Sequence, residues 1–242
     1  MRLFKKLIFI LFFLATITVA GGVGVAYLYQ NEIEQLIVSE LNEQLKTPIE
    51  INDIEFSVVK KFPYASLELS DVAILDAFGK DSLLTVQKLF LKFNALDLYN
   101  GNYTIQQLEI INGKALVYFN KKGLPNYKVW HTKTDSSASD PIQFGLEQVK
   151  LGNIQVTYLD KRSTLKIVAT AKEADLTGIF KNGIFSTQIT GDFFSDYILV
   201  NNINHLPKQD LKLWLSLDAA SNNTSFNGVA NTEGIELRVN GE

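Results

Sequence analysis

The chain has 242 residues, of which 46% are hydrophobic, and a formal net charge of -3. It has no cysteine, which excludes disulfides, thiol nucleophiles, cysteine zinc sites and a lipoprotein anchor. Its 26 acidic residues outnumber the 23 basic ones, so nucleic acid, which is bound by a basic surface, is not an expected partner.

Residues 7–29 carry no charge and predict a transmembrane helix. A helix of this length is about 34 Å long, enough to cross a hydrocarbon core of about 30 Å. Basic residues precede the span, at Arg2, Lys5 and Lys6, and Glu32 follows it. This asymmetry predicts that residues 1–29 form a cytoplasmic stub and a single-pass anchor, with the bulk of the chain outside the cytoplasm.

The alternative for this region is a cleaved signal peptide. Thr18, Val19 and Ala20 offer small side chains around a possible cleavage site. The apolar run continues beyond that site to Tyr29, however, and Tyr27 and Tyr29 are typical of a membrane interface. We therefore expect a retained anchor.

Residues 30–47 predict an amphipathic helix that caps the domain. Its apolar side chains recur at spacings of three and four and share one helical face: Ile33, Leu36, Ile37, Leu41 and Leu45. Pro48 ends the helix. The apolar stripe could pack on the membrane surface, on a partner helix or on the domain that follows. We expect the last, because an apolar face so close to a new fold usually plugs one end of its core.

From Ile49 onward, polar and apolar residues alternate with a period of two. This pattern predicts antiparallel strands with one buried face. It is clearest at residues 66–70, 88–93, 148–151, 164–167 and 234–239. The polar stretch 132–141 predicts a long loop or hinge between a first sheet segment, residues 48–131, and a second, residues 142–242. The expected fold class is mainly β, with two N-terminal helices followed by an extended antiparallel sheet.

A short pattern of apolar, charged, apolar, any, and Asp or Asn occurs three times, each copy 41 residues after the last. The copies begin at Leu67, Leu108 and Val149 and end at Asp71, Asn112 and Asn153. The pattern is either a coincidence or the sign of stacked, similar strand groups, as in a solenoid or an extended sheet. Leu69 has an odd number and Val72 an even one, so a regular strand would place these two apolar side chains on opposite faces. We therefore also expect a bulge or turn near Asp71.

Over residues 1–130 the sequence resembles the N-terminal region of the AsmA family. The resemblance depends on the order of five segments: KKFPYASLELSDV (60–72), DSLL (81–84), LYNG (98–101), IQQLEI (105–110) and KGLPN (122–126). Members of that family begin with a cytoplasmic stub, one inner-membrane helix and a short amphipathic helix, and continue as a long periplasmic sheet. The resemblance implies a curled antiparallel sheet whose inner face is an apolar groove, similar to chorein-type bridge-like lipid transfer proteins.

This resemblance implies an inner-membrane protein that binds or conducts phospholipid or another membrane lipid toward the outer membrane and supports outer-membrane biogenesis. The alternative is a non-enzymatic assembly or scaffold factor that acts on outer-membrane proteins through sheet-edge pairing. Residues 235–239 would provide that edge for an envelope protein or a second copy. Long family members have many hundreds of residues, so we expect this chain to be part of a longer protein or a short relative that needs a partner.

The sequence predicts no enzyme, no cofactor and no metal site. His131 and His205 lie in polar, loop-like contexts without a partner at ligand spacing. Glu68, Glu109 and Glu236 are expected to be solvated on the outer face of their strands. The candidate site is the apolar face of the first strands, with possible groove-lining residues Leu67, Leu69, Leu89, Leu91 and Phe93. Periodicity does not decide whether this face lines an open groove or a closed core.

Overall fold

The computed structural model describes residues 35, 38–39, 41–43, 45–61, 64–94, 97, 103–129, 142–181, 184–206, 208–220, 223–232 and 235–241. The strands are β1 (Ile49–Glu50), β2 (Asp53–Lys61), β3 (Tyr64–Leu75), β4 (Ser82–Asn94), β5 (Tyr103–Phe119), β6 (Ile142–Asp160), β7 (Leu165–Lys181), β8 (Ile184–Val200), β9 (Ile203–Leu206), β10 (Gln209–Ala220), β11 (Asn223–Thr232) and β12 (Ile235–Gly241). The protein is therefore mainly β.

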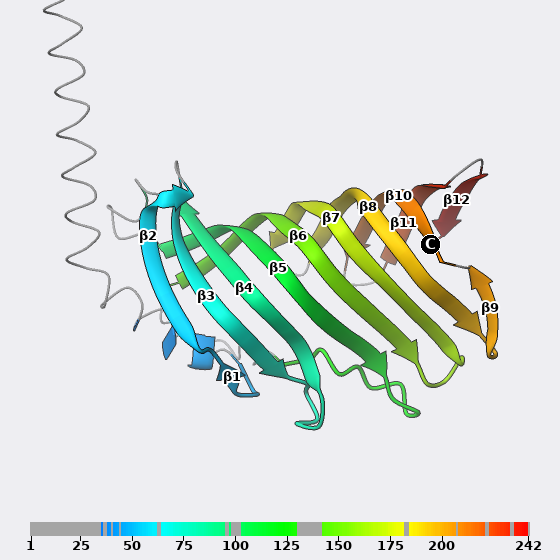
Figure 1. Ribbon diagram of the computed structural model, residues 1–242, viewed down its shortest axis with the longest axis horizontal. Coiled ribbons are helices and arrows are strands. Elements are labelled where there is room, and N and C mark those ends of the chain that lie inside the picture. The colour runs from blue at the N-terminus through cyan, green and yellow to red at the C-terminus, as the bar shows by residue number, and fades with distance from the viewer. Residues whose placement is uncertain are drawn as a thin grey trace, which may run out of the picture.

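All of these strands belong to one 12-stranded sheet with the order β1-β3-β4-β5-β6-β7-β8-β10-β11-β12. Two strands lie off this path, since β2 also pairs with β3, and β9 pairs with the end of β8. Figure 1 shows long, curved strands that follow one another along the molecule in nearly sequential order. The sheet is open, because β12 at one end does not pair with β1 or β2 at the other.

The expectation of a purely antiparallel sheet is wrong at one strand pair. β5 and β6 run parallel, with Ile110 opposite Leu151, whereas the other pairs are antiparallel. Alternation reports that one face is buried but carries no information on strand direction. A parallel pair needs a crossover connection, and residues 120–141 provide it. The hinge expected at residues 132–141 lies outside the described residues, and strands from both predicted segments share the one sheet.

In neighbouring strands, the alternation of side chains between the two faces of the sheet shifts at the same position across the sheet. Asp71, Asn112 and Asn153 have left-handed backbones, with φ of 50°, 54° and 55°. The residues just before and just after these positions are paired between the strands, and this register places Asp71 beside Gln87 of β4, Gln87 beside Asn112, and Asn112 beside Asn153. Asn153 Nδ2 donates to Asn112 Oδ1 at 3.0 Å, and Asn112 Nδ2 donates to Gln87 Oε1 at 3.0 Å. We call this transverse line of polar residues the kink line.

The kink line explains the change of parity near Asp71. Leu69 and Val72 are both 0% exposed and belong to the same cluster of buried apolar residues. We call it the core cluster; its members are Leu41, Phe56, Ala65, Leu67, Leu69, Val72, Val86, Leu89, Leu91, Phe93, Ile105, Ile110 and Ile154. The left-handed residue turns the following side chain back to the buried face, without an inserted residue in β3. Asparagine and aspartate tolerate this conformation better than other residues with a Cβ atom.

The parallel register also explains the repeat of 41 residues. β5 pairs with β6 so that Leu108 lies opposite Val149 and Ile110 opposite Leu151. β3 is antiparallel to β4, which is antiparallel to β5, so all three copies run in the same direction at the same level. The repeated pattern therefore marks equivalent positions in one extended sheet.

Replacing Asn112 with valine is expected to lower the free energy of unfolding by about 2 kcal/mol, because a β-branched residue is strained at positive φ. Asn112→Gly should cost less, since glycine adopts this conformation freely and loses only exposed side-chain hydrogen bonds. Urea denaturation would measure both. Lys114→Val is the control at an exposed position of β5. Equal stabilities for Asn112→Val and Asn112→Gly would contradict the role of the kink line.

Residues 41–43 and 45–47 contact one end of the sheet. Leu41 belongs to the core cluster, which otherwise consists of buried strand residues. Lys46 N donates to Val129 O at 2.7 Å, and Thr47 Oγ1 donates to Leu75 O at 3.0 Å. The described part of the predicted amphipathic segment thus packs on the domain that follows it.

The described residues contain no helix that is long and apolar enough to cross a membrane. The span expected at residues 7–29 lies outside them. Of residues 30–47, the described residues 35, 38–39 and 41–43 are helical. The helical anchor and the continuous capping helix remain predictions from the sequence.

Candidate functional site: a continuous apolar face

Two unbroken rows of apolar residues cross the sheet on one of its faces. Residues directly paired on neighbouring strands share a face, so the register defines each row. The first row consists of Ile54, Leu69, Leu89, Ile110, Leu151, Ala174, Gly191, Leu213 and Ala230. The second row consists of Phe56, Leu67, Leu91, Leu108, Val149, Leu176, Ile189, Leu215 and Gly228. We call these two rows the apolar face; both run from β2 to β11.

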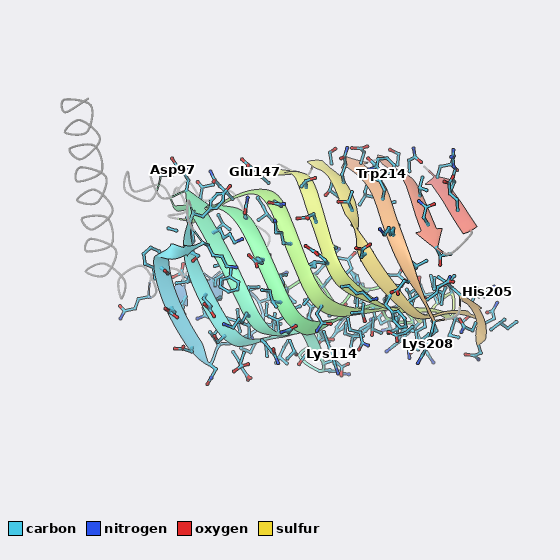
Figure 2. All side chains as sticks on the ribbon, turned by 45° about the horizontal axis from the view of Figure 1, so that its top comes forward. Asp97, Lys114, Glu147, His205, Lys208 and Trp214 are labelled. Carbon is cyan, nitrogen blue, oxygen red and sulfur yellow. The ribbon has the colours of Figure 1, made fainter. Side chains whose placement is uncertain are left out.

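The row between them, on the opposite face, has different chemistry. It consists of Glu55, Glu68, Phe90, Glu109, Lys150, Asp175, Thr190, Trp214 and Val229. Most of its side chains are charged or polar, and Trp214 is 39% exposed. Figure 2 shows side chains projecting from the sheet along its whole length, with Trp214 far from Asp97. The sheet is therefore amphipathic across nearly its full length.

The large side chains of the two rows are buried more deeply at one end of the sheet than at the other. Leu67 and Leu69 are 0% exposed and Leu91 is 3% exposed, whereas the larger side chains of the rows in β6 to β10 are half-buried. Burial of large apolar side chains also reaches the start of β6 to β10, because Ile154 of β6, which lies outside the two rows, is 2% exposed and belongs to the same core cluster. Leu41, which lies outside the strands, is a buried member of that cluster, whose other residues come mainly from β2 to β5. We call β2 to β5 the covered end and β6 to β10 the uncovered end.

Nothing in the described part of the chain forms a second layer over the uncovered end. Extensive contacts between its elements occur only between strands that are neighbours in the sheet. The half-buried residues at this end include Leu151, Leu176, Ile189, Leu213 and Leu215. Their side chains therefore keep part of their hydrocarbon surface exposed.

The residues predicted to line a groove all lie together at the covered end. Leu67, Leu69, Leu89, Leu91 and Phe93 are 0–8% exposed and belong to the core cluster. The equivalent positions at the uncovered end are not among the residues predicted from the sequence. Alternation in β10, with Leu211, Leu213, Leu215 and Leu217, was the signal that could have identified them.

Two carboxylates expected to be solvated are instead shielded by lysines on the opposite face. Glu109 binds Lys61 Nζ at 3.0 Å and Lys92 Nζ at 2.5 Å, and Glu68 pairs with Lys88. Burial acts to raise the pKa of Glu109, but the hydrogen bonds and charges of Lys92 and Lys61 outweigh it and lower the pKa. Their ion pairs give Glu68 and Glu109 a structural role.

Two other residues considered for chemistry lie at exposed positions, and one of them, Glu236, pairs with Arg238 of its own strand. Glu236 is exposed on β12, and His205 is exposed on β9, at the end of the sheet away from Asp97 (Figure 2). His131 lies outside the described residues. Among the residues that are described, no group of three or more histidine, aspartate or glutamate side chains is placed to hold a metal ion.

A buried polar network joins the turn between β3 and β4 to the end of β5. Asp76 is 0% exposed, and its carboxylate accepts hydrogen bonds from the backbone N of Phe78 at 3.1 Å and Lys80 at 3.0 Å. The Tyr118 hydroxyl donates to the same carboxylate at 2.8 Å. Asn126, also 0% exposed, accepts from Tyr118 N at 2.8 Å. The network anchors the start of the crossover to the sheet.

The fold and the apolar face define a mainly β protein with one open, mixed, amphipathic sheet. The sequence matches no known protein family, and no curated protein or solved structure shows significant similarity to it. The sheet itself is therefore the feature that bears on function.

Proposed function

We propose that the protein binds membrane lipid, with the acyl chains on the uncovered end of the apolar face. The observation that carries this proposal is the pair of rows that cross β2 to β11 without a charged or hydrogen-bonding side chain. Each methylene group removed from water there contributes about 0.8 kcal/mol. The half-buried leucines and isoleucines of β6 to β10 supply the hydrocarbon surface.

The chemistry of the rows favours an acyl chain over an extended peptide. A peptide lying flat on this face would leave buried backbone N–H and C=O groups without partners, at a cost of several kcal/mol. An acyl chain has no such groups. At about 4.8 Å per strand, the stretch from β6 to β11 spans roughly 19 Å, which is of the order of the length of an acyl chain.

The resemblance to the AsmA family extends this proposal to the cell envelope. On that basis the protein is anchored in the inner membrane through residues 7–29, with the sheet in the periplasm. It conducts lipid toward the outer membrane and supports outer-membrane biogenesis. No catalytic step is part of this proposal.

A second candidate function is an assembly or scaffold role through sheet-edge pairing. One observation favours it: β12 pairs with β11 only, so its other edge is unpaired within the described residues. An envelope protein or a second copy could add a strand there by β-augmentation.

Lipid extraction tests the first proposal. The full chain, purified in mild detergent, should release phospholipid into solvent, as detected by mass spectrometry. Leu215→Asp should reduce the bound lipid at least about tenfold, because a charge on the apolar face costs more than the ~1.4 kcal/mol that a tenfold change represents.

The matched control is Ser216→Asp, since Ser216 neighbours Leu215 on β10 but faces the opposite side of the sheet. It should keep its lipid. Absence of lipid from the native chain, or equal losses in both variants, would count against lipid binding on the apolar face.

A further inference from the structure

We infer that residues 41–43 and 45–47 act as a plug that closes the covered end of the apolar face, so that lipid occupies only the uncovered end until the plug is released. This inference depends on the proposed lipid binding and specifies where the lipid lies and what restricts it. The plug is part of the chain itself.

Leu41 is the residue that places the plug on the apolar face. It is 9% exposed, and within the described residues it is the only buried member of the core cluster that does not come from a strand. The cluster includes Leu67, Leu91 and Leu89 from the two apolar rows. Leu41 therefore belongs to the same buried hydrocarbon cluster as the rows whose side chains are half-buried farther along the sheet.

The hydrogen bonds of the plug attach it to the crossover and to the end of β3. They do not involve the apolar rows, which the plug contacts through side-chain packing. Lys46 N donates to the Val129 carbonyl in the crossover, and Thr47 Oγ1 donates to the Leu75 carbonyl at the end of β3. Asn42 and Glu43, which follow Leu41 directly, are exposed. The plug is thus a short amphipathic segment, whose apolar contact can be exchanged for another hydrocarbon.

The two apolar rows connect the ends without interruption. Leu108 and Ile110 of β5 pair with Val149 and Leu151 of β6, where the covered end meets the uncovered end. Because no polar residue separates them, an acyl chain that displaces Leu41 meets a continuous hydrocarbon surface. Plug release therefore lengthens the lipid-binding stretch toward β2.

Photocrosslinking tests the inference on the full chain. Vesicles of phosphatidylethanolamine and phosphatidylglycerol, with a trace of phosphatidylcholine carrying a diazirine acyl chain, are irradiated with the protein, and the adducts are mapped by mass spectrometry. In the native chain we expect adducts at Leu176, Ile189 and Leu215 and none at Leu67 or Leu91. In Leu41→Asn, adducts should also appear at Leu67 and Leu91, whereas Glu43→Gln should keep the native pattern.

Adducts at both ends of the native chain would overturn the plug while leaving lipid binding intact. The same holds if Leu41→Asn, folded, keeps the native pattern. Absence of adducts at every position would overturn the proposed function itself.

Cysteine labelling gives a second measurement that keeps the plug residues native. The chain has no cysteine, so single substitutions report one position each. Leu91→Cys should react with a maleimide at least about tenfold more slowly than Leu215→Cys, because its exposure requires local opening. Equal labelling rates for folded Leu91→Cys and folded Leu215→Cys would overturn the inference. This measurement does not require Leu41→Asn to fold.

Discussion

Replacing Leu91 with aspartate is expected to unfold the protein, with a loss of about 5 kcal/mol in the free energy of unfolding. Leu91 is 3% exposed and pairs with Leu67 and Leu108 in the second apolar row. A carboxylate at this position would be buried without a cation or a hydrogen-bond donor. Since domains of this kind are stable by only about 5–15 kcal/mol, this single change removes much of the total.

Circular dichroism and urea denaturation would measure the loss. Leu91→Met conserves volume and should cost less than about 1.5 kcal/mol. Thr85→Asp places the same charge at an exposed position of β4 and should be nearly neutral. A folded Leu91→Asp that has lost lipid would instead indicate that the covered end is an open groove.

Removing the Asp76 carboxylate is expected to cost about 3 kcal/mol, because several buried donors lose their acceptor at once. Asp76→Ala leaves the backbone N–H groups of Phe78 and Lys80 and the hydroxyl of Tyr118 without their partner. Asp81→Ala, at an exposed position in the same turn, is the matched control. Similar melting temperatures for the two variants would contradict a stabilising role for the network.

The same network predicts how stability depends on pH. Burial acts to raise the pKa of Asp76, but hydrogen bonds from Lys80, Tyr118 and Phe78 outweigh it and lower the pKa. The contribution of Asp76 is therefore present above its unfolded pKa of about 4 and is lost as the pH falls through the lower folded value.

At alkaline pH, Tyr118 determines whether the stability of the protein rises or falls with pH. Burial, followed by the hydrogen bond to Asp76, raises the pKa of Tyr118 from 10.0 to about 12. Its contribution is therefore present below pH 10 and is lost as the pH rises toward 12, by on the order of 2 kcal/mol. Unfolding measured across this range should show a steeper loss in the native chain than in Tyr118→Phe. Equal slopes would exclude Tyr118 as a source of the alkaline dependence.

The sequence by itself determined the features that depend on local order along the chain. Alternation with a period of two identified a mainly β protein and the apolar residues of its first strands. The shift in alternation between Leu69 and Val72 predicted a bulge or turn near Asp71, and the irregularity there is a left-handed residue without an inserted residue. The repeat of 41 residues marked positions at one level of the sheet in β3, β5 and β6, because equivalent strands of one sheet carry equivalent patterns.

Only the tertiary structure decided strand direction and coverage. β5 and β6 are parallel because the chain crosses back between them, and side-chain alternation is the same in parallel and antiparallel strands. Leu91 and Leu215 lie in the same apolar row and have the same local pattern, yet only Leu91 is fully buried. The difference comes from segments distant in sequence, such as that of Leu41, which pack at one end of the sheet. A local sequence pattern does not predict such a contact.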